Sequence, residues 1–336
     1  MQNRRVVLTE RPDGVVKASN FTVENVELGD VGDGEIRVQV SHLSVDAFIR
    51  TTLDDGDNFH GKAELRAPVM ALGVGQVIES RADGLSVGDW VTGATMAQSI
   101  AQGNAAGFQK IDPGNQSPSL FLGLLGMTTG LTAYAGMCRV GEASAGDTVV
   151  VSGAAGAVGT VACQLAKHSG ARVIGIAGGS AKCEWLTDTI GIDGAVDYKA
   201  GDVGGQLDKL VPEGIDLFFD NVGGEILDEA LDRISMGARV VLCGAVSQYG
   251  NMEEVRGPRL YLRIPERNAS MRGFTVDYYQ SEFPAFSAQI VEWMDAGLKL
   301  PEQIEEGIDA FPEALNKMFT GGHMGKLLVA PTPSQA

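Results

Sequence analysis

Three regularly spaced glycines are the first residues of this chain whose type and spacing could do chemistry. They follow the β-branched run Thr148 to Val151 and stand at Gly153, Gly156 and Gly159. Glycine here allows a tight bend, a close approach of backbone to a pyrophosphate, and close packing of helix on strand. Amide N–H groups at the start of the next helix, including those of Ala157 and Val158, would bind phosphate oxygens. We therefore expect a dinucleotide site, with a structural turn as the alternative because the spacing is GxxGxxG rather than GxGxxG.

The turn after the next strand indicates which dinucleotide would bind. The strand, Arg172 to Ala177, leads into a small uncharged turn with Gly179 and Ser180, then Lys182, and no carboxylate occurs before Glu184. In NAD sites an acidic residue about twenty positions after the glycines binds the ribose hydroxyls, and it would repel a 2′-phosphate. The turn therefore favours NADPH, with Lys182 as the phosphate contact. A solvated surface lysine is the alternative.

The elements that must position these residues alternate between strands and helices from about residue 120 onward. After the first two strands, the pattern predicts strands at 195–198, 215–220, 238–243 and 271–276, and helices at 126–134, 225–234 and 286–294. Such alternation makes βαβ units, so we expect an α/β fold with a Rossmann-type, doubly wound parallel sheet of about six strands. Ligands in these sheets lie beyond the carboxyl ends of the strands, where Gly153, Asn221 and Gly244 fall.

The first part of the chain has a different character. Short strands are predicted at 4–9, 35–43, 69–80 and 89–92, with glycines between them, which is typical of a β-rich, barrel-like domain. The chain ends with a predicted helix at 312–319 and a strand at 326–329, which we expect to return to that domain. The predicted domains are therefore 1–119 together with 300–336, and 120–299 for nucleotide binding.

Composition excludes several classes of partner. The chain has 26 Lys and Arg against 43 Asp and Glu, a formal charge of −17, which disfavours nucleic acid and anionic membranes. Its four cysteines are scattered singly and match neither a disulfide framework nor a zinc pattern. Neither a signal segment nor a run of about eighteen apolar residues is present. We expect a soluble, cytoplasmic protein without a metal.

Several motifs, in order along nearly the whole chain, resemble those of one family. Besides the glycine turn, they are Ser44–Arg50 (SVDAFIR), Gly126–Tyr134 (GMTTGLTAY), Asp220–Gly224 (DNVGG), Cys243–Tyr249 (CGAVSQY) and Arg272–Val276 (RGFTV). They are similar to motifs of the zinc-free medium-chain dehydrogenases/reductases, and within these to the NADPH-dependent alkenal, or prostaglandin and leukotriene, double-bond reductases. The resemblance implies a GroES-like catalytic domain beside the Rossmann domain, reduction of the C=C bond of an α,β-unsaturated aldehyde or ketone, and a homodimer.

The resemblance also implies which residues contact the cofactor. Besides the glycine turn and Lys182, they are Tyr198, Asn221, Cys243, Gly244, Ala245, Ser247, Tyr249, Phe274, Thr275 and Val276. The family's asparagine near the last strand is His323 here, which is either a substitute contact or a plain loop histidine. The family's SVDPYMR tyrosine is Phe48, so no hydroxyl is available for proton transfer at that position.

The implied reaction needs a proton donor besides the hydride. Without a zinc ion, conjugation in the substrate must spread the charge created by hydride addition at the β-carbon. A tyrosine hydroxyl, which is protonated at neutral pH, could then donate the proton. Tyr261 resembles a tyrosine in the bacterial branch of the family and is the first candidate, and Tyr249 is the second. Solvent or a ribose hydroxyl could serve instead, and Tyr261 could simply pack between domains.

Other functions stay open on the same scaffold. A zinc-free quinone oxidoreductase and an enoyl-thioester reductase are the enzymatic alternatives. A protein that binds the nucleotide without turnover is the non-catalytic one.

Overall fold

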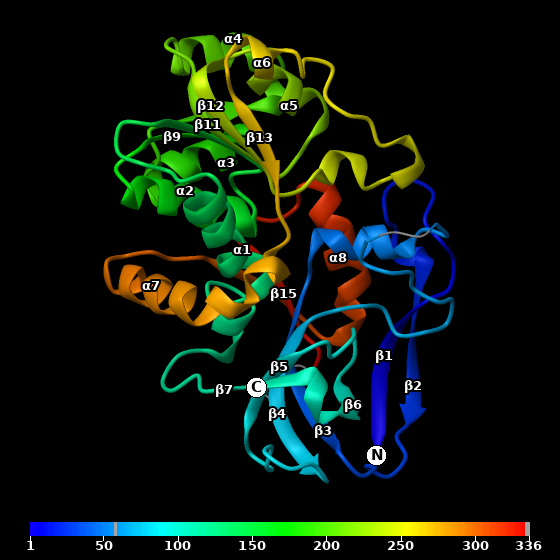
Figure 1. Ribbon diagram of the computed structural model, residues 1–336. Helices are drawn as coiled ribbons and strands as arrows, with labels where there is room; N and C mark the ends of the chain where they lie inside the picture. Colours follow the sequence, from blue (N-terminus) through cyan, green and yellow to red (C-terminus); the bar gives the residue numbers. More distant parts are fainter. Residues whose placement is uncertain (57–58, 333–336) are drawn as a thin grey trace.

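The computed structural model describes residues 1–56 and 59–332 (Figure 1). Residues 57–58 and 333–336, which belong to the predicted domain 1–119 with 300–336, lie outside the described part. Its upper part contains a six-stranded, fully parallel sheet in the order β10-β9-β8-β11-β12-β13. This order confirms the predicted Rossmann-type α/β fold. The strands are β8 (Thr148–Ser152), β9 (Arg172–Ala177), β10 (Gly194–Asp197), β11 (Ile215–Asp220), β12 (Ile234–Leu242) and β13 (Ser270–Gly273).

Helices cover both faces of this sheet, which is why its strands read as continuous apolar runs. Val149 and Val151 of β8 belong to the core that includes α2 (Ala157–His168) and α7 (Phe283–Asp295). Val150 points the other way, into the core formed with α4 (Val203–Leu210) and α5 (Gly224–Leu231). The shorter helices of this part are α1 (Thr132–Tyr134), α3 (Ser180–Trp185) and α6 (Arg263–Glu266).

The other part of the molecule is β-rich. A seven-stranded, mostly antiparallel sheet has the order β14-β15-β3-β4-β5-β7, with β6 paired to β3, and β1 and β2 form a separate ribbon (Figure 1). Helix α8 (Phe311–Thr320) packs on its core through Phe311 and Leu315. The strands are β1 (Gln2–Leu8), β2 (Phe21–Glu27), β3 (Glu35–Ser44), β4 (Gly73–Ser80), β5 (Trp90–Gly93), β6 (Ile100–Asn104), β7 (Phe108–Ile111), β14 (Glu302–Glu306) and β15 (Lys326–Ala330).

Several element boundaries differ from the predicted ones for local reasons. The helix predicted to reach residue 234 ends at Leu231, because Ile234 already pairs with Ile215 in the parallel ladder. The segment predicted as a helix at 126–134 begins with a π-helical turn, Met127–Leu131. There Gly130 packs so closely that an added Cβ would lie 1.7 Å from the carbonyl oxygen of Leu124. Strands β2, β6, β7 and β14 were not predicted.

The end of the chain joins the two parts. Strand β15 pairs with β3 and β14 of the β-rich sheet. Just before β15, the amide of Gly325 donates to the carbonyl of Ala155 in the glycine turn, at 2.9 Å. The last described strand therefore lies against the turn that opens α2. Within residues 1–56 and 59–332, no helix has the length and apolar character needed to span a membrane.

Candidate cofactor and substrate site

One edge of the parallel sheet collects most of the predicted site residues. All its strands run in the same direction, so the segments that follow them meet at the carboxyl edge. Gly153 follows β8, Gly179 follows β9, Tyr198 follows β10, Asn221 follows β11 and Gly244 follows β12. Five strands therefore each deliver a predicted residue to the same edge.

The glycine turn has the geometry of a phosphate site. Gly153 has a positive φ of 59°, and its carbonyl accepts a hydrogen bond from the Gly156 amide at 3.0 Å. An added Cβ on Gly159 would lie 2.3 Å from the Gly153 carbonyl oxygen, so the turn and α2 can approach only with glycine there. Gly156, Ala157 and Val158 are partly exposed at the start of the 12-residue helix. The amides of Ala157 and Val158, in the first turn, favour an anion there.

Asp220 holds the neighbouring loop in place. Its buried carboxylate accepts hydrogen bonds from the Ser152 hydroxyl at 2.7 Å and from the amides of Val222 and Gly223 at 3.0 and 3.1 Å. Burial raises the pKa of this carboxyl, although these hydrogen bonds act in the opposite direction. The Asn221 side chain donates to the Ser152 carbonyl at 2.7 Å, so the loop is fixed beside the glycine turn.

Two lysines converge beside the second and third strands. The Nζ atoms of Lys199 and Lys182 lie 3.7 and 3.8 Å from the point where a Cβ on Gly321 would stand. Partial burial and repulsion from Lys199 lower the pKa of Lys182. In the described part of the chain, neither lysine forms an ion pair with a carboxylate within 4.0 Å. Two adjacent cations without a direct ion pair, in a chain of charge −17, favour an anion site.

The small turn that precedes Lys182, residues 178–180, is held by hydrogen bonds. Asp197 accepts hydrogen bonds from the amides of Gly179 and Lys199 at 2.7 and 2.9 Å, which ties the two turns together. Ser180 is exposed, and the ring of Tyr198 lies 2.7 Å from where a Cβ on Gly178 would stand. Lys199 was missed from the sequence, although a lysine directly after the predicted third strand was a usable signal.

His323 lies near the same lysines, on the segment between α8 and β15. Its Nδ1 is 3.4 Å from the Lys317 carbonyl oxygen. Burial and the nearby charges of Lys182 and Lys326 lower its pKa to about 4, so the imidazole is neutral at pH 7. The structure therefore places this predicted contact beside Lys182.

The loop after β12 carries the second tyrosine candidate. The hydroxyl oxygen of Tyr249 accepts a hydrogen bond from the Ala245 amide at 3.2 Å, and the Ser247 hydroxyl donates to the Val222 carbonyl at 2.6 Å. Burial raises the pKa of Tyr249, which keeps the phenol protonated. Burial also raises the pKa of Cys243 to about 12, so this thiol is not a nucleophile at neutral pH.

The remaining candidates separate into two places. Phe274, Thr275 and Val276 come directly after β13 and so belong to the carboxyl edge. Tyr261 precedes β13, and the adjacent Leu260 amide donates to Asp228 on α5 at 3.0 Å. The Tyr261 side chain is 57% exposed. The structure therefore does not bring Tyr261 together with the other predicted residues.

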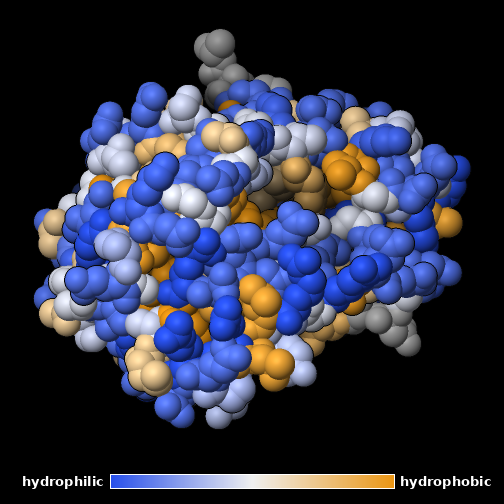
Figure 2. Space-filling view, turned by 90° about the horizontal axis from the view of Figure 1, so that it is seen from above, coloured by the Kyte–Doolittle hydropathy of each residue, from blue (hydrophilic) through white to orange (hydrophobic). Residues whose placement is uncertain are grey.

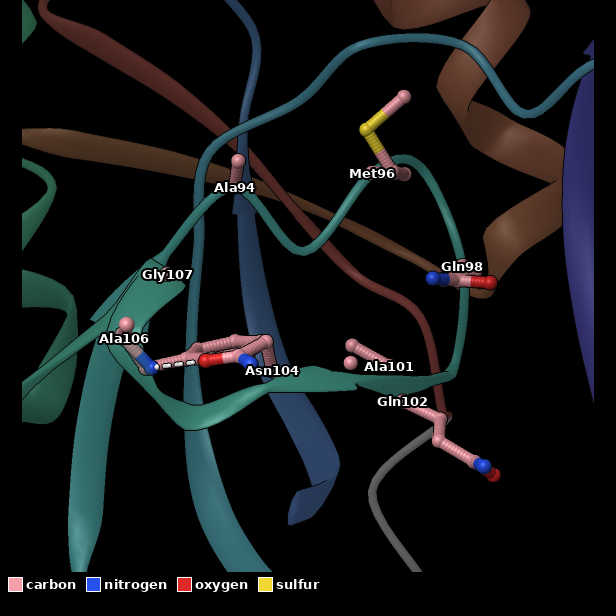
Figure 3. A pocket seen from close by; sticks show the side chains of 10 residues that line it. Ala94, Met96, Gln98, Ala101, Gln102, Asn104, Ala106 and Gly107 are labelled. Carbon is pink, nitrogen blue, oxygen red and sulfur yellow. Dashed lines mark hydrogen bonds between the residues drawn. The ribbon is translucent and has the colours of Figure 1, made fainter. Parts of the chain in front are cut away.

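The molecular surface shows a hollow near the middle of the face seen from above, with apolar residues on its inner walls (Figure 2). A separate cavity of about 510 Å³ lies on the β-rich part between the 94–98 loop and β6 (Figure 3). Its lining contains none of the predicted site residues. Asn104 there turns back to accept a hydrogen bond from the Ala106 amide at 2.9 Å, and the Gln98 side chain donates to the Thr95 carbonyl at 2.8 Å. That cavity therefore presents no reactive group.

Titratable side chains do not gather into a metal centre in the part of the chain that the structure describes. No group of three or more His, Cys, Asp or Glu residues there could hold a metal ion. The four cysteines, at 138, 163, 183 and 243, are free thiols.

Comparison with known proteins identifies the family. Residues 4–111 match the N-terminal domain of oxidoreductases, and residues 157–292 match the zinc-binding dehydrogenases. The chain is 37% identical to the NADP-dependent oxidoreductase YfmJ of Bacillus subtilis, over 97% of both chains. It is 31% identical to the NADPH-dependent curcumin reductase of Escherichia coli, over 98% of this chain and 96% of the relative. It is 32% identical to the 2-alkenal reductase (NADP(+)-dependent) of Nicotiana tabacum, over 98% and 97%.

A solved structure agrees with these relatives over the full length. CurA from Vibrio vulnificus, crystallised in complex with NADPH, is 33% identical and superposes with a TM-score of 0.93, over 99% of this chain and 100% of CurA. The resemblance drawn from the sequence motifs is thereby confirmed. The chain belongs to the zinc-free medium-chain dehydrogenases/reductases.

Proposed function

We propose that this chain is an NADPH-dependent reductase of the C=C bond in α,β-unsaturated aldehydes and ketones. The observation that carries the proposal is the convergence of Lys182 and Lys199 on Gly321, because two cations at this edge suit the 2′-phosphate of NADPH. The names of the full-length relatives, a curcumin reductase and a 2-alkenal reductase, support the same reaction class.

The cofactor is NADP(H), which supplies the hydride. The amides of Ala157 and Val158 would hold its pyrophosphate, with Gly153, Gly156 and Gly159 shaping the turn. Gly179, Ser180, Lys182 and Tyr198 would surround the 2′-phosphate, with His323 on the facing segment. The residues after β11, β12 and β13 would contact the other half of the cofactor: Asn221, Cys243, Gly244, Ala245, Ser247, Tyr249, Phe274, Thr275 and Val276.

Tyr249 is the side chain that we propose as proton donor or as hydrogen-bond donor to the enolate oxygen. Its phenol stays protonated because burial raises its pKa, and it lies on the loop at the carboxyl edge. Its oxygen accepts from the Ala245 amide, which leaves the phenolic proton for a second partner. Tyr261, the first candidate from the sequence, becomes the alternative in this proposal, because its exposed position before β13 supports it less.

Product analysis tests the function directly. The purified protein is incubated with NADPH and 3-nonen-2-one, and the product is identified by mass spectrometry. A saturated ketone is expected; an allylic alcohol, or no consumption of NADPH, would contradict the proposal. Tyr249→Phe should lower kcat by about a hundredfold, the lower end of the range for a general acid, while Tyr261→Phe should not.

We also propose a homodimer in the cytoplasm. β13 is an edge strand of the parallel sheet, and its Arg272 and Gly273 are exposed, so a second copy could pair with it. Four free thiols suit a reducing compartment. Sedimentation equilibrium should give twice the chain mass of 35.3 kDa, whereas a mass equal to one chain would contradict the dimer.

A further inference from the structure

Two buried charges, four residues apart, remain outside the proposed chemistry. Asp46 and Arg50 belong to the motif around η2, the 3-10 helix Ala47–Leu53, and both side chains are almost completely covered. Charged groups are buried rarely, and only with partners that satisfy them. The partners of these two residues lie in the nucleotide-binding part as well as in the β-rich part.

Arg50 is the first of these links. Its guanidinium donates to the carbonyls of Gly14 and Gly250 and forms an ion pair with Asp54, with Nη1 to Oδ1 at 2.6 Å. Gly250 lies 200 residues further along and directly follows Tyr249. A guanidinium presents its donors in a rigid planar fork, so three acceptors from three segments are held in a fixed arrangement.

Asp46 is the second link, and its side chain does not cap the helix that it precedes. It is the N-cap residue of η2, where an aspartate side chain usually accepts hydrogen bonds from amides of its own helix, yet the Asp46 side chain makes no such bond. Its carboxylate instead accepts from the Ser44 hydroxyl, from the Thr128 hydroxyl at 3.2 Å and from the Lys326 ammonium at 2.8 Å. Lys326 is 1% exposed and also donates to the Thr129 hydroxyl at 3.1 Å.

These contacts reach segments that pack against α2 or bond to the glycine turn before it. Thr128 and Thr129 lie in the π-helical turn Met127–Leu131, and Lys326 directly follows Gly325, which is bonded to the glycine turn. Between the two charges stands Phe48, partly exposed, with its ring 5.0 Å from that of His60. The turn that carries Phe48 is therefore tied at one end to residues 128, 129 and 326 and at the other to residue 250.

Stability alone is a weak explanation for this arrangement. Replacing a buried ion pair by well-packed apolar side chains is often neutral or stabilising, because the charges lose their hydration. Fixed orientation is the property that such a network supplies and an apolar contact does not.

We propose that Asp46 and Arg50 are positioning residues that hold the Phe48 turn against the two nucleotide-side segments, 127–131 and 249–250. They thereby set the geometry of the cleft in which hydride transfer takes place. This inference rests on the proposed function, because hydride transfer is the step that depends on that geometry.

The test compares Arg50→Lys with Arg37→Lys. Arg37 is a matched control: it is also buried and also binds three segments, through Glu79, Gln102 and Gly29, but all of them belong to the β-rich part. We expect Arg50→Lys to lower kcat by about tenfold or more and to raise the primary isotope effect with deuterated NADPH, since misplaced reactants slow the chemical step. Arg37→Lys should leave kcat and the isotope effect unchanged at a similar loss of melting temperature.

Asp46 is tested with a pair of variants that separates charge burial from orientation. Asp46→Asn alone leaves the Lys326 ammonium without its carboxylate, and folding suffers. The double variant Asp46→Asn with Lys326→Met removes both charges and should fold, yet its kcat should still fall. An unchanged kcat and isotope effect in both the double variant and Arg50→Lys would overturn the proposal.

Hydrogen–deuterium exchange distinguishes this inference from the proposed function, because it needs no turnover. Faster exchange is expected in residues 126–131 for the Asp46 double variant and in residues 249–251 for Arg50→Lys, but in neither segment for Arg37→Lys. Uniform exchange changes in all three would overturn the positioning role. If the wild type reduced no enone while these segments responded as expected, the proposed substrate would fail and the positioning contacts would stand.

Discussion

Neutralising the two lysines beside Gly321 should weaken the binding of NADPH and leave the binding of NADH unchanged. The proposed variants are Lys182→Gln and Lys199→Gln. A hydrogen bond to a charged group contributes about 1.5–3 kcal/mol, and Lys182 is partly buried, so its loss should weaken NADPH binding by roughly 10-fold to 150-fold. Lys199 is exposed and more strongly screened, so the expected loss is several-fold.

Lys182 and Lys199 also influence each other. Lys199 contributes to the lowered pKa of Lys182, so Lys199→Gln should raise that pKa. The double variant should lose more NADPH affinity than either single variant, because both cations are then absent. Neither variant should change NADH binding, because NADH has no 2′-phosphate.

Fluorescence titration with NADPH, NADH and 2′,5′-ADP at two salt concentrations measures these effects. Lys209→Gln is the control, because Lys209 is an exposed lysine on α4 and its loss changes the net charge by the same amount. The preference for NADPH should also fall as salt rises. If NADPH and NADH weakened equally, or if Lys209→Gln matched Lys199→Gln, the assignment of the 2′-phosphate to this pair would be refuted.

Three further outcomes are expected. Gly159→Ala should destabilise the fold by about 1–3 kcal/mol in urea unfolding, since its Cβ would lie 2.3 Å from the Gly153 carbonyl. Gly156→Ala would place its Cβ 3.3 Å from the Gly153 carbonyl oxygen, a tight contact but a longer one than at Gly159, so it should lower the melting temperature less than Gly159→Ala and bind NADPH at least about tenfold more weakly in titration. His323 has a folded pKa of about 4 against 6.5, so the unfolded chain takes its proton first. The contribution of His323 to the free energy of unfolding is complete above pH 6.5 and is lost as the pH falls to 4. In unfolding at several pH values, His323→Gln should reduce the stability lost between pH 6.5 and pH 4 by on the order of 2–3 kcal/mol.

The parallel sheet was predictable because its signals are local. Thr148 to Val151 form a β-branched run and the apolar positions of α2 repeat with helical spacing, so both elements follow from neighbouring residues. The glycine turn and Lys182 could be proposed as cofactor contacts because glycine and lysine have a specific chemical use at that place.

Long-range contacts were not predictable in the same way. The meeting of Lys199 with Gly321, and of Asp46 with Lys326, depends on segments separated by more than a hundred residues. Short edge strands such as β14, with alternating exposed glutamates, have too few apolar residues to be recognised from periodicity. Tyr261 was chosen by similarity of motif, and its 57% exposure is a tertiary property that the motif does not carry.

The bond between Gly325 and Ala155 has a consequence for how the protein matures during synthesis. The glycine turn leaves the ribosome some 170 residues before its neighbour Gly325, as their positions in the chain show. Domains generally fold as units in the order of their emergence, so the parallel sheet can form first. Its nucleotide pocket nevertheless lacks a wall until the final strand arrives. A nascent chain stalled at residue 320 should therefore contain a folded sheet that does not retain the dinucleotide, and cofactor loading becomes the last step of biogenesis.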